Sequence, residues 1–585
     1  MTDLPFISPV NLADVEEGSP LSHPLPTIFS KSELSKSELI QRIQDLVPPG
    51  SPAPQNPQII HVLKVLTQRL IAAYQADGSC CEDPFAEVWA RSIHLYELEV
   101  RQHLVNQVVL VTGGEGCVGS RLIEKLKTLG VKRIISVDKA RYTPGGAIAS
   151  TLFTRESGVE LRQYALDIRD QNAIDFVFAT EKPNIVFHLA AQRLPWLAEI
   201  QIWETVTSNI FGTQNVIRAC ETHHVQRCIV SSTGKASRYL TGEVYAASKK
   251  MMEWQLAQAA QSGSVIYGMV RFTHMLDNSS FCQVYEDQIQ QEKPINVHAP
   301  HRYIVGQNVT EATHLLLNAL VFSEPKRLKF LLCRNLGWPV ETLEVALYKI
   351  LQSGQAHYIY FQGVTVGYEE SFFRGQVDWQ NPAEINTLIN VIECQTKAID
   401  PSGHMIMAEV PAFSKNLLNQ HLNYLKELVD CPNLPESEIK QALAQAVYAV
   451  SGSVCAKAPT QILLKILRWG TEVNPLEADG TAAAAFQGIL ELLVTGLYKS
   501  LKHFDRPLTE SQTLILRSVT QEVAQLQSCF KTLGWEQSET LTIAISALEA
   551  LHPAPTVNPS FKPSKEPMFP SGSIGTYGLE IGLTA

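Results

Sequence analysis

The sequence predicts an α/β protein with a doubly wound parallel sheet, an N-terminal helical extension and a separate C-terminal all-helical domain. Short apolar runs such as VVLVTG and NIVFHLAA are typical of buried parallel strands. Between them lie segments with apolar residues at helical spacing, such as SRLIEKLKTLG. Strands that alternate with helices in this way form a parallel sheet covered on both faces, because the crossover connections are right-handed.

The predicted elements follow one another in a regular order. After VVLVTG, the expected strands are IISVD, NIVFHLAA, RCIVSST and VIYGMVRF. The helices between them are SRLIEKLKTLG, AIDFVFATEKP, TQNVIRACETHH and YAASKKMMEWQLAQAAQ. Helical patterns also precede the first strand, and beyond Pro401 the chain reads as almost entirely helical.

Composition and pattern together divide the chain into successive parts. The ends are rich in Pro and Ser and lack periodicity, which indicates disorder. The predicted parts are a disordered segment (1–35), a helical extension (36–105), the α/β domain (106–400) with a small substrate subdomain (about 275–400), a helical domain (401–552) and a disordered tail (553–585).

Charge and cysteine usage exclude several classes of function. The net charge of −10 argues against a general nucleic-acid-binding protein, which normally carries a basic field. The 11 cysteines show no zinc-ligand spacing, so we expect free thiols and no metal site. No secretory signal and no apolar run of membrane-spanning length is found. These features predict a cytoplasmic protein.

The segment TGGEGCVG places Gly113, Gly116 and Gly119 between the first strand and the first helix. This context predicts a dinucleotide-binding loop, in which the glycines permit a tight turn, close approach of a pyrophosphate and packing of the helix on the strand. The phosphates would then accept hydrogen bonds from free N–H groups at the helix start. Cys117 and Val118 complete the expected cofactor-binding loop.

Asp138 ends the second strand, where a carboxylate can bind the ribose hydroxyls of the cofactor. This position favours NAD. Lys139 and Arg141 follow directly and could instead bind the 2′-phosphate of NADP, so NADP stays open as the alternative.

Tyr245 and Lys249 form a Tyr-x-x-x-Lys pair on one face of the predicted long helix. An ammonium group near the phenol would lower the pKa of Tyr245, which could then transfer a proton while hydride moves to or from the cofactor. Upstream, Ser231, Ser232 and Thr233 end a strand, where a hydroxyl can position a substrate. We therefore expect Thr233, Tyr245 and Lys249 to be catalytic.

From residue 106 to about 335, the chain resembles the extended short-chain dehydrogenases, and within them the polysaccharide-biosynthesis branch of nucleotide-sugar epimerases and dehydratases. The segments that carry the resemblance are VVLVTGGEGCVGSRL, ALDIRD, KPNIVFHLAA, TSNIFGTQNVIRAC, VSSTGKA, YAASKK and INVHAPHRYIVGQNVTEATHLLL. The resemblance implies a Rossmann-type fold, a nicotinamide cofactor, a nucleotide-sugar substrate and a homodimer formed through a four-helix bundle.

The resemblance also implies roles for individual residues. Asp167 and Ile168 would contact adenine, and Ala190 and Ala191 would line the cofactor channel. Asn209 would order the central helix, and Arg302 would bind the nucleotide diphosphate through a bidentate fork. The expected substrate-binding set is Ser232, Lys235, Asn209 and Arg302.

One departure from the family bears on the reaction. Dehydratases of the family usually carry Ser-Thr-Asp-Lys, whereas this chain has Ser232-Thr233-Gly234-Lys235 and lacks the acid that protonates the departing hydroxyl. Glu243 is the nearby carboxyl group that could replace it. The leading hypothesis is an epimerase/dehydratase-like enzyme with dehydration disfavoured. The alternatives are an oxidoreductase for a non-sugar carbonyl or alcohol, and a non-catalytic cofactor-binding scaffold.

Overall fold

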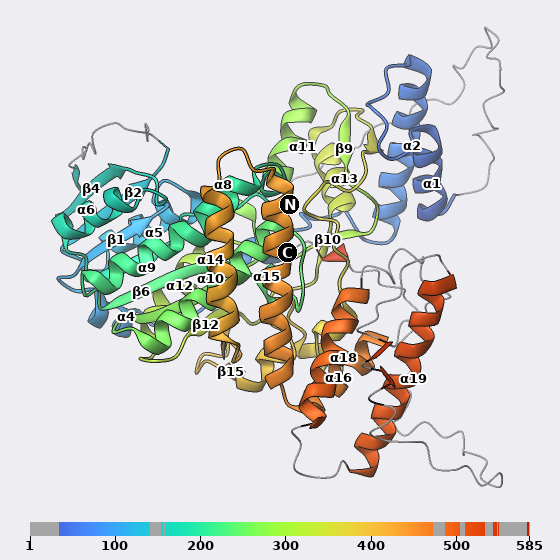
Figure 1. Ribbon diagram of the computed structural model, residues 1–585. Coiled ribbons are helices and arrows are strands. Elements are labelled where there is room, and N and C mark those ends of the chain that lie inside the picture. Colours follow the sequence, from blue (N-terminus) through green and yellow to red (C-terminus); the bar gives the residue numbers. More distant parts are fainter. Residues whose placement is uncertain are drawn as a thin grey trace, which may run out of the picture. The chain divides into compact units, whose positions relative to one another are not determined.

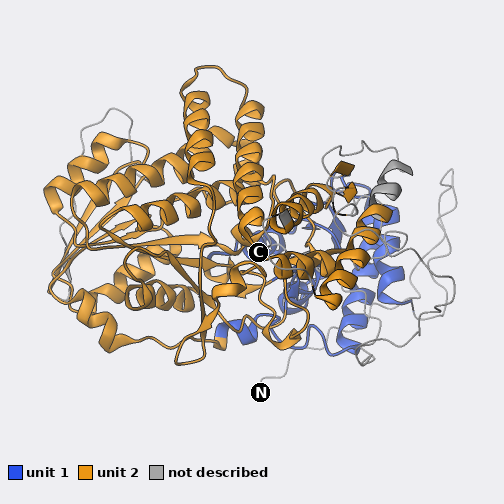
Figure 2. Ribbon diagram, turned by 60° about the horizontal axis from the view of Figure 1, so that its bottom comes forward, with its two compact units in different colours: residues 1–89, 278–304, 339–364 blue, residues 90–277, 305–338, 365–585 orange. Residues whose placement is uncertain are grey.

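The computed structural model describes residues 34–140, 154–156, 158–471, 486–502 and 509–532, together with a few positions beyond them. The expected disorder of residues 1–35 and 553–585 falls almost wholly outside the described residues, as does Arg141. The chain forms two compact units (Figure 2). Unit 1 contains residues 1–89, 278–304 and 339–364, and unit 2 contains residues 90–277, 305–338 and 365–585.

Unit 2 is built on one large sheet whose central strands are parallel (Figure 1). Its antiparallel edge strands are β3, β16 and β15. In spatial order the strands are β15 (Ala398–Ile399), β16 (Met405–Glu409), β12 (Lys329–Cys333), β7 (Ile266–Phe272), β6 (Arg227–Thr233), β5 (Ile185–His188), β1 (Val108–Thr112), β2 (Arg133–Asp138), β4 (Val159–Ala165) and β3 (Thr154–Glu156). The predicted α/β class with a doubly wound, mainly parallel sheet is confirmed.

The strand register aligns the carboxyl ends of the central strands at one edge. Thr112 of β1 lies opposite His188 of β5, and Thr233 of β6 lies opposite Phe272 of β7. The apolar residues Val109, Leu110 and Val111 of β1 are completely buried, as a strand covered on both faces requires. Polar residues that follow these strands therefore meet at one edge of the sheet.

Helices cover both faces of this sheet. They are α4 (Glu97–Leu104), α5 (Cys117–Lys127), α6 (Gln171–Glu181), α9 (Thr213–Thr222), α10 (Val244–Ser262) and α12 (Val309–Phe322). The connection after β5 contains α7 (Pro195–Ile200), α8 (Ile202–Val206) and the π-helical turn η1 (Thr207–Gly212). Polar N-cap residues fix the starts of α6 and α12. Asp170 accepts a hydrogen bond from Ala173 N–H, and Asn308 forms a capping box with Glu311.

The C-terminal region is helical, as predicted, but its first helices do not form a core of their own. Helices α14 (Lys415–Asp430) and α15 (Glu436–Lys457) bury Leu422 and Leu443 in the same apolar cluster as Met251 and Trp254 of α10. Helices α16 (Thr460–Thr471), α18 (Gln487–Lys502) and α19 (Glu510–Thr532) contribute to a second cluster. The expected boundary at residue 401 therefore differs from the observed packing, because α14 and α15 complete the core around α10.

Unit 1 combines the predicted helical extension with parts of the predicted substrate subdomain. Its helices are α1 (Lys36–Leu46), α2 (Pro57–Ala76), α11 (Ser280–Gln290) and α13 (Thr342–Ser353), and the short α3 (Ala86–Ala90) ends where unit 2 begins. Strand β9 (Ile295–Val297) pairs with β14 (Ile359–Phe361), and β10 (Arg302–Ile304) pairs with β13 (Val340–Glu341). The Tyr74 hydroxyl donates to Glu341 at 2.7 Å, which ties α2 to the later segment.

No helix in the described ranges combines the length and apolar character needed to cross a bilayer.

Candidate functional site

The edge formed by the carboxyl ends of β1, β2, β4, β5 and β6 collects the predicted site residues of unit 2. The residues are Gly113, Gly116, Cys117, Val118, Gly119, Asp138, Asp167, Ile168, Ala190, Ala191, Asn209, Ser232, Thr233, Lys235, Tyr245 and Lys249. Arg302 lies in unit 1, at the start of β10. Its expected role toward a diphosphate remains a prediction.

In the loop between β1 and α5, the backbone leaves no room for a side chain at Gly113 or Gly119. Gly113 has a φ of +73°, and a Cβ there would lie 2.8 Å from the backbone nitrogen of Ala190. A Cβ on Gly119 would lie 2.1 Å from the carbonyl oxygen of Gly113. The first helical hydrogen bond runs from Ser120 N–H to Gly116 O, so the N–H groups of Cys117 and Val118 have no intrahelical acceptor. This geometry fits a diphosphate.

Asp138, at the end of β2, lies beside this loop. Its carboxylate accepts hydrogen bonds from Glu115 N–H at 3.0 Å and from Ala140 N–H at 3.1 Å. The ammonium of Lys139 pairs with Glu204 at 2.5 Å. The Asp138 carboxylate is thus held in place at the end of β2, and Lys139, one of the two cations that could bind a 2′-phosphate, is engaged with Glu204.

Asp167 and Ile168 follow β4 and are both buried. The Asp167 carboxylate accepts bonds from the backbone and the guanidinium of Arg169, at 2.6 to 2.9 Å. Burial raises the pKa of Asp167, but the bonds from Arg169 outweigh burial and hold the pKa below its usual value. The side chain of Asn215 donates to the carbonyl of Ile168 at 3.0 Å, which fixes the turn.

His188, which the sequence reasoning did not single out, ends β5 beneath the site. Its ring nitrogens contact the hydroxyls of Thr112 at 2.7 Å and Thr213 at 3.0 Å. Burial, aided by the charge of Lys249, lowers the pKa of His188 to about 3, so the ring is neutral at physiological pH. The Thr112 hydroxyl also accepts from Ala190 N–H at 3.3 Å. His188 therefore anchors the strand end that carries Ala190 and Ala191.

Asn209 links the loop after β5 to helix α10. Its side-chain oxygen accepts from Gln192 N–H at 2.8 Å, and its amide nitrogen lies 3.0 Å from both Gln192 O and the hydroxyl of Ser248. Ser248 is the residue directly before Lys249. Asn209 thus orders the central helices rather than presenting its amide to a ligand.

Tyr245 and Lys249 lie on α10 next to the end of β6. Burial raises the pKa of Tyr245, and a hydrogen bond with Thr233 and the charge of Arg193 oppose this shift. In the chain alone, burial thus dominates the pKa of Tyr245, and the expected lowering by Lys249 together with a nicotinamide ring remains a prediction. Lys249 donates to the carbonyl of Ser231 at 2.8 Å, and burial lowers its pKa to about 8.

Ser232 lies on the other side of β6 and takes part in a buried charge network. Its hydroxyl donates to Glu253 at 2.6 Å. The guanidinium of Arg271 bridges Glu253 and Glu393, at 2.6 and 2.7 Å. This differs from the expectation that Ser232 contacts the substrate, because its hydroxyl is committed to a carboxylate in the interior.

Lys235 is also buried, and its ammonium pairs with Glu243 at 2.7 Å. Glu243 pairs in addition with Arg238 at 2.8 Å, and Arg238 pairs with Glu370 at 2.6 Å. Burial raises the pKa of Glu243, but the two cations outweigh burial and leave the pKa lowered. Lys235 therefore lies in an internal ion-pair network rather than facing a substrate, and its two cationic partners favour the carboxylate form of Glu243.

The reason for the missing acid is visible at Gly234. A Cβ at this position would lie 2.7 Å from Cγ and 3.4 Å from Cα of Leu388. Leu388 is completely buried, and its carbonyl accepts from Arg271 at 2.9 Å. The segment around Leu388 thus occupies the space into which a side chain at position 234 would extend.

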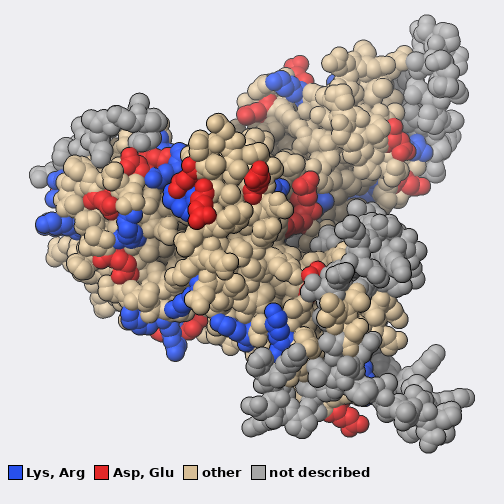
Figure 3. Space-filling view, in the orientation of Figure 1, with Lys and Arg blue, Asp and Glu red and all other residues tan. Residues whose placement is uncertain are grey.

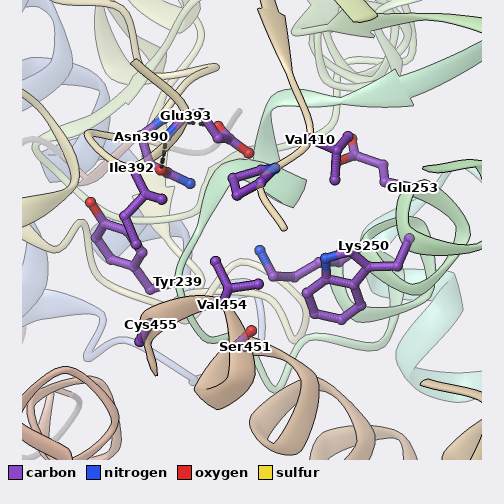
Figure 4. Close-up of a pocket in the computed structure, with 12 residues that line it drawn as sticks. Tyr239, Lys250, Glu253, Asn390, Ile392, Glu393, Val410, Ser451, Val454 and Cys455 are labelled. Carbon is purple, nitrogen blue, oxygen red and sulfur yellow. Dashed lines mark hydrogen bonds between the residues drawn. The ribbon is translucent and has the colours of Figure 1, made fainter. Parts of the chain in front are cut away.

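A small cavity lies beside α10, lined also by Asn390, Ile392 and Glu393 and by α15 (Figure 4). Its volume of about 30 Å³ suits one or two water molecules and excludes a nucleotide sugar. Lys250 lines it and donates to the carbonyls of Ala236 at 3.0 Å and Arg238 at 2.6 Å. The Ser451 hydroxyl, on α15, has no hydrogen-bond partner among the described residues.

The described residues contain no cluster of His, Cys, Asp or Glu arranged to hold a metal ion. On the face drawn in Figure 3, acidic and basic side chains are interspersed rather than gathered into a basic field.

Residues 109–367 match the family described as polysaccharide biosynthesis protein, and the resemblance seen in the sequence is confirmed over this region. The chain is 25% identical over 315 residues to the capsular polysaccharide biosynthesis protein CapD of Staphylococcus aureus, covering 50% of this chain and 51% of that one. It is 24% identical over 291 residues to the probable polysaccharide biosynthesis protein EpsC of Bacillus subtilis, covering 48% and 47%. The chain thus spans about half the length of these relatives.

Among solved structures, the UDP-glucose 4-epimerase of Thermus thermophilus in complex with NAD is similar to this chain, with a TM-score of 0.37 and 21% identity. The match covers 44% of this chain and 88% of that one.

Proposed function

We propose that unit 2 is an NAD-dependent enzyme that acts on a nucleotide sugar by redox-neutral epimerisation or by carbonyl and alcohol interconversion, not by dehydration. The observation that carries this proposal is the convergence of Thr233, Tyr245 and Lys249 at the sheet edge that also carries the Gly113–Gly119 loop. The match of residues 109–367 to the polysaccharide biosynthesis family supports the substrate class.

The cofactor would be held by residues of this chain in defined roles. Free N–H groups at the start of α5 would bind the diphosphate, and the Asp138 carboxylate would accept bonds from the adenosine ribose. The pairing of Lys139 with Glu204 favours NAD over NADP. The neutral His188 ring would support the end of β5 and, with it, Ala190 and Ala191, which would line the cofactor channel. When bound, the nicotinamide would supply reversible hydride acceptance.

The proposed catalytic residues would transfer the proton of the reacting sugar hydroxyl. Tyr245, as the phenolate, would accept the proton of the hydroxyl on the reacting sugar carbon while hydride leaves that carbon, and as the phenol it would return the proton when hydride is given back. Thr233, whose hydroxyl lowers the pKa of Tyr245, would orient both groups. Lys249 would hold its ammonium against the carbonyl of Ser231 and stabilise the phenolate by its charge. No carboxylic acid is available at position 234 or from Glu243, so the loss of a hydroxyl as water has no proton donor there.

The test uses the purified full-length chain incubated with NAD and a panel of UDP- and dTDP-sugars, with products separated by chromatography. We expect turnover to an epimer or a keto sugar without loss of water. Tyr245→Phe should lower kcat by at least about 100-fold and leave NAD binding intact. The matched control is Tyr424→Phe, which removes a hydroxyl from an exposed position on α14. NAD binding with no turnover of any sugar would contradict the proposal, and so would formation of a dehydrated product.

A further inference from the structure

Side chains from one face of α10 bind successive residues at the end of β6. They lie four residues apart along the helix, so they share a face. The pairs are Tyr245 with the hydroxyl of Thr233, Lys249 with the carbonyl of Ser231 at 2.8 Å, and Glu253 with the hydroxyl of Ser232 at 2.6 Å. Glu253 therefore fixes the strand residue that lies between the contacts of Tyr245 and Lys249.

Arg271, on β7, holds Glu253 in place. Its Nε and one Nη donate to the Glu253 carboxylate at 2.9 and 2.6 Å, and its two Nη atoms donate to Glu393 at 2.8 and 2.7 Å. The remaining N–H donates to the carbonyl of Leu388 at 2.9 Å, so all five N–H groups of the guanidinium have acceptors. Arg271, Glu253 and Glu393 are each at most 4% exposed, so water does not compete for these bonds.

Glu393 comes from η6 (Glu393–Thr396), which lies beyond the region 109–367 that matches the family. Its backbone N–H donates to the side chain of Asn390 at 3.0 Å, and its carboxylate accepts from Asn390 N–H at 3.0 Å. Asn390 donates in turn to the carbonyl of Ser237 at 2.7 Å, in the turn that follows β6. The second carboxylate of the buried network is thus held in a fixed position by a segment outside the family region.

The network carries one more negative than positive charge, because two carboxylates share one guanidinium. Burial lowers the pKa of Lys249 to about 8, and the charge of Glu253 opposes this shift. Tyr245, on the same helix, and His188, on β5, are both neutral at physiological pH, because burial raises the pKa of the phenol and lowers the pKa of the imidazole. Glu253 therefore favours the ammonium form that the proposed role of Lys249 requires.

We propose that Glu393 is a positioning residue for the proposed reaction. Acting through Arg271 and Glu253, it fixes the end of β6. That strand end is thereby held against the face of α10 that carries Tyr245 and Lys249. This inference rests on the proposed function. A neutral side chain at position 393 would leave the guanidinium with an unmatched N–H, and a displacement of about 1 Å at a catalytic group costs up to about 100-fold in rate.

The test compares steady-state kinetics of the full-length, NAD-loaded chain with those of matched variants. Glu393→Gln removes the charge, and Glu393→Asp keeps it on a shorter side chain. Ser232→Ala removes the hydroxyl that links the network to β6, and the double variant Glu393→Gln/Ser232→Ala completes a cycle. The control is Glu384→Gln, because Glu384 lies in the same segment but pairs with Arg334 and Lys397 instead of Arg271.

Glu393→Gln should lower kcat by about 10- to 100-fold and leave KM and NAD affinity within about 2-fold of wild type, because only the placement of the catalytic groups changes. Glu393→Asp should recover part of kcat. The double variant should be no slower than the slower single variant, because both changes break the same chain of contacts. Losses that multiply in the double variant would overturn the inference.

The inference stays testable if Glu393→Gln does not fold, which thermal denaturation reports. Ser232→Ala leaves every charge of the network in place, so it should fold and should also lower kcat. Wild-type kcat in Ser232→Ala would overturn the inference.

A second measurement does not depend on turnover. NMR titration of lysine side chains labelled with ¹³C at Cε gives the pKa of Lys249, whose signal is identified by its absence in Lys249→Met. This pKa should be lower in Glu393→Gln than in wild type and unchanged in Glu384→Gln, because only the former removes the excess negative charge of the network. An unchanged pKa of Lys249 in Glu393→Gln would overturn the inference. A lowered pKa, together with no turnover of any sugar by the wild type, would uphold the action of Glu393 on Lys249 and contradict the proposed function.

Discussion

Glu199 on α7 pairs with Lys440 on α15 at 2.6 Å, and its other carboxylate oxygen accepts from the backbone N–H of Val244 at 2.7 Å. Val244 is the first residue of α10 and directly precedes Tyr245. A carboxylate at this place caps a free N–H and complements the positive end of the helix. The C-terminal helices are thus tied, through one side chain, to the start of the helix that carries Tyr245 and Lys249.

Lys440→Met should therefore affect activity more than stability. The ion pair is partly exposed, so its loss should cost less than about 1 kcal/mol of unfolding free energy. Glu199 would then be free to move, and kcat should fall because Tyr245 is less well placed. Denaturant titration and steady-state kinetics check both values, and Lys440→Arg should restore kcat. The control Lys349→Met removes a 2.7 Å ion pair in unit 1 and should leave kcat unchanged; an equal fall in both variants would contradict the positioning role.

A second prediction concerns association. The family resemblance predicts a homodimer formed through a four-helix bundle. Helix α10 is the long helix that could supply part of such a bundle, but α14 and α15 pack against it. Trp254 lies 6.2 Å from Phe413 between ring centroids, and Gln258 donates to Asn419 at 3.0 Å. Trp203 donates to the carbonyl of Val429 at 2.9 Å. We expect that α10 takes no part in any self-association.

Light scattering coupled to size exclusion measures the mass of the full-length chain, which we expect to be that of a monomer. If a dimer elutes, cysteines are placed on α10 and on α14, and cross-linking between two copies shows which of the two helices lies in the dimer contact. Cross-links between two copies of α10 would contradict the prediction.

The cofactor loop and the Tyr245–Lys249 pair could be predicted because each depends on local pattern. A strand, a glycine turn and a helix start lie within a few residues, and a Tyr-x-x-x-Lys spacing fixes one helix face. The roles of Ser232 and Lys235 could not be predicted in this way. The partner of Ser232 is Glu253 on α10, and the partner of Lys235 is Glu243 at the N-cap of the same helix. Whether the side chains of Ser232 and Lys235 face the interior or a ligand depends on how the end of β6 packs, which local sequence pattern does not reveal.

The segment after β14 packs against the site region, and the sequence does not predict this because the segment has no regular pattern. Residues 365–397 contain short 3-10 turns, η4 (Arg374–Gln376), η5 (Pro382–Glu384) and η6 (Glu393–Thr396), and no apolar periodicity. Leu388 and Glu393 act through long-range contacts with Gly234 and Arg271. Unit 1 poses the same difficulty, because it is assembled from segments far apart in the chain.

Lys250 should make stability depend on pH in a defined window. Burial lowers its pKa to about 8 from the ordinary value of 10.5. Between these values the unfolded chain binds the proton and the folded chain does not, so the free energy of unfolding rises as pH increases from about 8 to 10.5. Lys249 contributes in the same direction. Lys250→Met should make the rise between pH 8 and pH 10 shallower.

Denaturant titrations at several pH values measure how the free energy of unfolding changes with pH. This slope is separate from the pH-independent loss of stability that the variant suffers because the carbonyls of Ala236 and Arg238 lose their donor. Lys457→Met is a useful control, because Lys457 also donates to a backbone carbonyl, that of Phe413 at 2.7 Å. An unchanged slope in Lys250→Met would show that Lys250 keeps its charge throughout this range.

Restoring the family's acid by Gly234→Asp should fail to create a dehydratase and should destabilise the fold. The new Cβ would lie 2.7 Å from Leu388 Cγ, and Leu388 cannot retreat easily because its carbonyl is bound by Arg271 and its N–H by Asn386. Overpacking of this kind costs about 1 to 3 kcal/mol. In Gly234→Asp/Leu388→Ala the added side chain has room, so the double variant should be more stable than the sum of the two single losses predicts. Unfolding free energies of the four proteins give the coupling directly, and additive losses would show that Leu388 is not the group that excludes a side chain at position 234.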